Sequence, residues 1–117
     1  MKYVLLFGAP ADGTYPAAPH TDAVHAEIMD WWQKHASAGV ILEGERLQGA
    51  ATATTFRTGG DLAVETIDGP FIEAKEEVSG YGVIEVADLD AALDLARTWP
   101  ALKLPGESVE VRPIYVM

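Results

Sequence analysis

Three side chains of this sequence, His25, Asp68 and Arg112, have the chemistry that an acid–base reaction on a small molecule needs. Imidazole titrates near neutrality and can both donate and accept a proton. A carboxylate can act as a base or orient a histidine, and a guanidinium can hold an anionic or phenolic oxygen. We therefore predict that His25 moves protons, that Asp68 assists or orients it, and that Arg112 holds a substrate oxygen.

Each of these residues also has an ordinary structural interpretation. His25 falls in the first turns of an expected helix, where it could be a surface or capping residue. Asp68 opens an Asp-Gly-Pro turn, in which the aspartate bonds its own turn and the glycine accepts positive φ. Arg112 lies inside an expected strand, so it either reaches water or lines a polar cleft. The sequence leaves both interpretations open.

The other candidate sites are weaker. His20 is expected on a loop surface, and His35, near a helix C-terminus, as a dipole partner or core-edge residue. His20 and His25 lack the i, i+4 spacing that sets two metal ligands on one helix face, so we predict no metal site. The absence of cysteine excludes disulfides, thiolate nucleophiles and cysteine-ligated zinc. No glycine-rich phosphate loop follows a strand, and we expect no cofactor.

The elements that must position these residues follow an α+β order within one domain, residues 1–117. The expected order is β-α-β, a β-hairpin, then β-α-β, which is the ferredoxin-like pattern with extra strands. The first helix should begin at Thr21 or Asp22, after a loop over residues 8–20, and the second should be capped by Asp88. The expected strands are Lys2–Phe7, Val40–Glu45, Ala51–Arg57, Leu62–Ile67, Tyr81–Val86 and Val109–Val116, with an irregular segment at Phe71–Ser79.

The first helix has two apolar faces side by side. Val24, Ile28, Trp31 and His35 form one face, and His25, Met29, Trp32 and Ala36 form the adjacent one. Because Trp31 and Trp32 are consecutive, they cannot share a face. We expect one in the core and the other at a rim or interface.

The central strands are apolar on both sides. In the first strand Tyr3, Leu5 and Phe7 point one way, while Val4 and Leu6 point the other way. Two helices can cover only one face of such a sheet, so the second face also needs a cover. We predict that a second copy supplies it and that the protein is a homodimer; the alternative is that the hairpin or a loop folds over these strands.

Charge and hydropathy exclude several partners. The net charge of −10 disfavours duplex nucleic acid and anionic membranes, since binding either is driven largely by basic residues. The N-terminal apolar run at residues 4–7 is too short to span a bilayer and lacks the apolar region of a signal peptide, so we expect the cytoplasm.

Residues 68–86, DGPFIEAKEEVSGYGVIEV, resemble the signature of the DGPF branch of the YCII-related proteins. The likeness extends to the start MKYVLLF, to GVILEGERL at 39–47, to TATTFR at 52–57 and to residues 110–113. These elements in order are more specific than the bare tetrapeptide.

The resemblance implies a dimeric α+β barrel, in which two ferredoxin-like sheets face one another. It places Lys75, Glu76 and Tyr81 in the motif as candidate substrate-binding residues, and Lys75 could hold an anionic substrate or pair with Asp68. Some wider relatives carry a His–Asp pair proposed as an active site, whose histidine falls near Glu27 here. One branch of the wider family carries out dehalogenation-type chemistry on aromatic rings.

Two function classes follow. The first is a small-molecule enzyme or ligand-binding protein with a polar cleft at the sheet interface. The second is a non-catalytic regulatory protein, because members of the DGPF branch are often encoded beside, or fused to, sigma factors of the extracytoplasmic-function type. A basic partner would suit the acidic surface.

Overall fold

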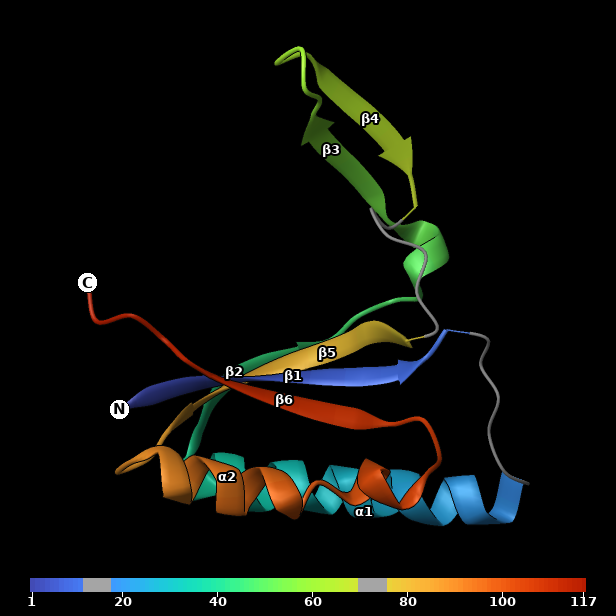
Figure 1. Ribbon diagram of the computed structural model, residues 1–117. Helices are drawn as coiled ribbons and strands as arrows, with labels where there is room; N and C mark the ends of the chain where they lie inside the picture. The colour runs from blue at the N-terminus through green and yellow to red at the C-terminus, as the bar shows by residue number, and fades with distance from the viewer. Residues whose placement is uncertain (12–17, 70–75) are drawn as a thin grey trace.

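The computed structural model describes residues 1–11, 18–69 and 76–117 and has a mixed α+β architecture (Figure 1). Along the chain the elements are β1 (Lys2–Pro10), α1 (Ala18–Ser37), β2 (Ile41–Arg46), the 3-10 turn η1 (Ala50–Thr52), β3 (Thr54–Thr58), β4 (Val64–Asp68), β5 (Glu76–Glu85), α2 (Leu89–Arg97), the 3-10 turn η2 (Pro100–Lys103) and β6 (Ser108–Pro113). None of the described helices is long and apolar enough to cross a membrane.

Four strands form one antiparallel sheet in the order β2-β5-β1-β6. Both α-helices pack on the same face of this sheet, and no α-helix of the described residues covers the other face (Figure 1). We call this second side the bare face. The strands β3 and β4 form a separate two-stranded hairpin that stands off on the bare-face side.

The core lies between the sheet and the helices. Alternation along β1 buries Tyr3, Leu5 and Phe7 on the helix side. From α1, Trp31 belongs to the same buried cluster, Ile28 packs against it and Val24 is also buried, which confirms the first of the two predicted helix faces. Trp31 Nε1 donates a hydrogen bond of 2.8 Å to Thr98 Oγ1, so this buried ring keeps its polar atom satisfied.

The second helix is short and well capped. Asp88 accepts a hydrogen bond of 2.9 Å from the backbone N–H of Ala91, as predicted for an N-cap. Ala92 and Ala96 are its buried residues, and their small side chains let α2 lie close to the sheet.

Several predicted boundaries were wrong. Helix α1 starts at Ala18, before the expected caps, and the last strand ends at Pro113 rather than at Val116. Residues 76–79, expected to be irregular, begin β5: after a bulge at Phe7/Gly8, Glu76 to Val78 pair with the end of β1. The hairpin's second strand starts at Val64, because Leu62 has φ +66° and belongs to the turn.

Candidate ligand pocket

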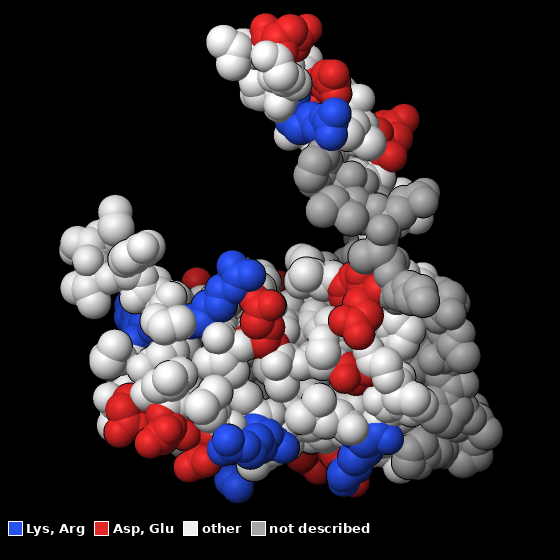
Figure 2. Space-filling model, viewed as in Figure 1, with Lys and Arg blue, Asp and Glu red and all other residues white. Residues whose placement is uncertain are grey.

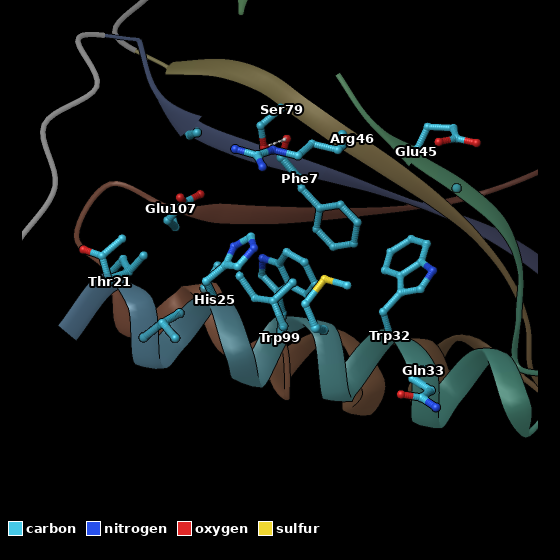
Figure 3. A pocket seen from close by; sticks show the side chains of 18 residues that line it. Phe7, Thr21, His25, Trp32, Gln33, Glu45, Arg46, Ser79, Trp99 and Glu107 are labelled. Carbon is cyan, nitrogen blue, oxygen red and sulfur yellow. Dashed lines mark hydrogen bonds between the residues drawn. The ribbon is translucent and has the colours of Figure 1, made fainter. Parts of the chain in front are cut away.

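A pocket of about 650 Å³ opens between α1 and the helix side of the sheet (Figure 3). Helix α1 contributes the second of its two faces, with His25, Met29 and Trp32. The sheet contributes parts of β1, β2 and β5, and the segment after α2 closes a third side with Trp99, Ala101, Leu104 and Glu107. An ion pair of 2.6 Å between Lys103 and Glu27 ties that segment to α1.

Glycines make room for the pocket on the sheet side. Gly44 and Gly82 lie opposite one another on β2 and β5, facing α1. A Cβ at Gly44 would lie 2.5 Å from Trp32 Cη2, and one at Gly82 would lie 3.3 Å from the same atom. The Trp32 ring therefore packs directly on the glycine backbone of β2 and β5. Trp32 is the half-buried member of the tryptophan pair and Trp31 is the core member, which agrees with the prediction of one core and one rim residue.

Aromatic rings form the apolar wall. Phe7 stacks on Trp99 with ring centroids 4.0 Å apart and planes 22° apart, and it meets Trp32 edge-on at 6.3 Å. Trp99 is 8% exposed, and its buried Nε1 has no hydrogen-bond partner in the part of the chain that the structure describes. Such a surface favours a flat apolar group, because aromatic rings bury large areas and stack.

Polar groups gather on one side of this wall. Figure 3 shows His25 reaching up from α1 while Arg46 reaches across from the end of β2, with Ser79 beside Arg46. Ser79 Oγ donates a hydrogen bond of 3.2 Å to the carbonyl of Phe7, which fixes its hydroxyl. His25 and Arg46 are exposed, and neither side chain forms a hydrogen bond or an ion pair with another described residue.

Among the residues predicted to form a site, His25 lines the pocket and the other described ones do not. Asp68 is exposed at the end of β4, on the hairpin. Arg112 is exposed on the bare face, where its guanidinium bonds Glu110. One chain therefore does not bring His25, Asp68 and Arg112 together.

The three motif residues are also separate from the pocket. Glu76 is exposed at the first position of β5, and Tyr81 is half-buried on the bare face. Lys75 lies outside the described residues. Glu27, where the wider relatives' histidine falls, is engaged with Lys103.

Sequence reasoning missed Arg46, Ser79 and Glu107, which come from three elements far apart in the chain. A signal for Arg46 was present: it is two residues from Gly44 on β2, so both lie on the same side of the strand.

His35 is a core-edge residue rather than part of the pocket. Its ring meets Trp31 edge-on at 4.9 Å. Burial, and secondly the positive charge of Lys34, lower the pKa of the His35 imidazole from its ordinary value. The described residues contain no group of three histidine, aspartate or glutamate side chains that could hold a metal ion.

Comparison with known proteins gives a family. The model of the YCII-related domain matches residues 1–117. The chain belongs to the YCII-related family. This YCII-related protein is also 39% identical over 83 residues to an uncharacterized protein of Rhizobium meliloti (strain 1021). The match covers 70% of this chain and 65% of that relative, so the chain spans less than two thirds of the relative's length.

Proposed function

We propose that this YCII-related protein binds a small molecule in the pocket between α1 and the sheet, and that His25 transfers a proton to or from it. The observation that carries the proposal is the pocket itself, in which an aromatic wall faces the His25 imidazole, whose nitrogens have no partner among the described residues. Its volume of about 650 Å³ falls within the range typical of small-molecule sites, about 300–1,000 Å³.

The proton-transfer role rests on the position of His25. Its side chain is open to the pocket, and no hydrogen bond among the described residues fixes either ring nitrogen. A neutral imidazole has one nitrogen that donates and one that accepts a proton, and general acid–base catalysis typically contributes about 10²–10⁴-fold in rate. We place Asp68 and Arg112 outside this step, because neither lines the pocket.

Fragment binding tests the pocket. We expect small apolar fragments to shift the backbone amide NMR signals of Ala9, Ser79 and Gly80, which line it. Met29→Trp should abolish these shifts, because Met29 lies at the pocket and is 60% exposed, so the larger ring can fill the space without disturbing the core. Shifts confined to other parts of the protein would count against the proposal.

Solvent exchange tests the histidine. For a bound fragment with a carbon–hydrogen bond beside a carbonyl group, we expect deuterium from the solvent to be incorporated. His25→Gln should slow the incorporation by about 10²-fold or more, whereas His35→Gln serves as the matched control outside the pocket. Equal rates for the two variants would refute the role of His25.

We further propose that the protein is a homodimer formed through the bare face, as a dimeric α+β barrel of the DGPF branch. The strand order β2-β5-β1-β6 with both helices on one side supports the ferredoxin-like pattern. Val4 and Leu6 pair with Val83 and Tyr81, and these four half-buried side chains form a continuous apolar patch that none of the described elements covers. Such a patch is typical of an interface.

The hairpin supports the same proposal. Phe56 and Val64 lie on one side of it and are 69% and 68% exposed, while the Arg57–Glu65 ion pair lies on the other side. An isolated two-stranded hairpin is marginally stable in water, so its apolar side needs a partner. The hairpin stands clear of the body on the bare-face side (Figure 2), where a second copy would meet it.

Analytical ultracentrifugation tests the dimer. We expect a particle of twice the 12.5 kDa chain mass. Val83→Glu should yield monomers, because it places a second carboxylate opposite Glu43 in the patch. The double change Phe56→Ser and Val64→Ser should weaken the dimer, and Arg57→Gln with Glu65→Gln, on the opposite side of the same hairpin, is its control. A wild-type chain that sediments as a monomer would end the proposal.

A further inference from the structure

Arg46 differs from most of the positively charged residues that the structure describes. Four of these residues form ion pairs with acidic neighbours: Arg57, Arg97, Lys103 and Arg112. Arg46 forms none within the described residues, although the chain carries 18 acidic side chains against 8 basic ones. An arginine without an acidic partner, placed at an aromatic pocket of an acidic protein, needs another explanation.

The backbone directs Arg46 toward the pocket. It pairs in register with Gly80 on β5, two positions from the Gly44–Gly82 pair, and this side of the strands faces α1. Glu45, its neighbour in sequence, pairs with Tyr81 and so projects to the bare face. Figure 3 shows the guanidinium of Arg46 turned back over the pocket beside Ser79, while the Glu45 carboxylate points away. The nearest acid in sequence therefore does not compete for this guanidinium.

The pocket lining thus combines one cationic side chain, Arg46, with an extended apolar surface and two carboxylates: Glu45, which points away, and Glu107 on the segment after α2. Phe7, Trp32 and Trp99 supply rings that favour a flat apolar body. A guanidinium offers paired N–H donors that match the two oxygens of a carboxylate. His25 faces the same region from the helix side (Figure 3).

We propose that the ligand of this pocket is a flat, ring-containing organic anion, an aromatic or alicyclic carboxylate, whose carboxylate binds Arg46 while its ring packs on Phe7, Trp32 and Trp99. This inference rests on the proposed function, since it names the ligand class of the same pocket. The arrangement sets the anionic end of the ligand against the sheet and leaves its ring between the aromatic wall and His25.

Calorimetric titration with a matched pair of probes tests the inference. The probes are 2-naphthoate and its neutral amide, 2-naphthamide, which share one ring system and differ in charge. We expect the wild-type protein to bind 2-naphthoate about tenfold to a hundredfold more tightly than the amide, because a hydrogen-bonded charged pair contributes that much. Arg46→Gln should remove the difference without weakening the amide.

Two further variants sharpen the result. Arg46→Lys keeps the charge but loses the paired donors, so the preference for the anion should fall between those of the wild type and Arg46→Gln. Arg97→Gln removes an exposed arginine that does not line the pocket and should leave the preference unchanged. Both Arg46 and Arg97 are exposed, so these changes leave the core intact.

The outcomes separate this inference from the proposed function. Equal affinity of the wild type for both probes, or an Arg46→Gln variant that keeps the preference, would overturn the anion assignment while the pocket stands. Failure of both probes to bind would overturn the pocket as a small-molecule site and the anion assignment together.

Discussion

Replacing Gly44 by alanine is the sharpest test of how the pocket is built. The new Cβ would lie 2.5 Å from Trp32 Cη2 and would also collide with the carbonyl oxygen of Tyr81. The tryptophan ring could tilt away toward the pocket. The carbonyl belongs to β5, however, so it cannot move without shifting the sheet. The structure therefore cannot relieve this collision by a small local movement.

The magnitude follows from two opposing effects. Overpacking a well-packed site typically destabilises by about 1–3 kcal/mol, and a backbone collision favours the upper end of that range. Against this, exchanging glycine for alanine inside a strand recovers roughly 0.5–1 kcal/mol of backbone entropy. We therefore expect Gly44→Ala to lower the free energy of unfolding by about 2 kcal/mol. For a chain of this length that corresponds to a fall in Tm of roughly 8 °C.

Urea denaturation followed by far-ultraviolet circular dichroism measures this difference. Gly49→Ala is the matched control, because no heavy atom lies within 4 Å of its added Cβ and its φ of −58° suits any residue. We expect the control to stay within about 0.5 kcal/mol of the wild type. If Gly44→Ala proved as stable as Gly49→Ala, the close packing of Trp32 on β2 would be wrong. In the Trp32→Leu background, Gly44→Ala should lower the free energy of unfolding by less than it does in the wild type. The reduction that remains is the part due to the Tyr81 carbonyl.

Three further outcomes test the frame around the pocket. Asp88→Ala should destabilise the protein by about 1 kcal/mol in thermal melts, since the backbone N–H of Ala91 loses its cap. Thr98→Val should cost about 0.5–1.5 kcal/mol in urea unfolding, because Trp31 Nε1 loses its acceptor in a partly buried site. The pKa of His35 in the folded protein lies below its unfolded value near 6.5. Between these two pKa values the unfolded chain binds more protons than the folded one, so the free energy of unfolding should fall as the pH drops through this window. His35→Gln should flatten that part of the stability–pH curve, and an unchanged slope would contradict the assignment.

Much of the scaffold could be predicted from local patterns. The spacing of Val24, Ile28 and Trp31 located the core face of α1, because helical periodicity is a property of neighbouring residues. The start of β5 was missed for the opposite reason. Its first residues pair with the end of β1 across a bulge, and nothing in the charged composition of residues 76–79 signals a partner more than sixty positions away.

The pocket was harder to predict than the scaffold. His25 could be chosen because an imidazole can both donate and accept a proton and because the residue falls in the first turns of the expected helix, after the long loop. Asp68 and Arg112 were chosen for their chemistry, and the fold places them on the hairpin and the bare face instead. Arg46 and Glu107 meet at the pocket only after β2 and the segment following α2 are brought against α1, so their proximity depends on tertiary structure.

The aromatic cluster has a consequence for optical measurements. All three tryptophans of the chain lie within it, with Trp31 6.1 Å from Trp32 and 5.0 Å from Trp99 between ring centroids. Excitation energy absorbed by one indole can migrate to the others at such separations, so the intrinsic emission reports the helix–sheet layer as a single unit. The hairpin contains no tryptophan and is silent in this signal. A hairpin that melts early would therefore leave the emission spectrum unchanged, and its unfolding has to be followed with a label or by backbone NMR.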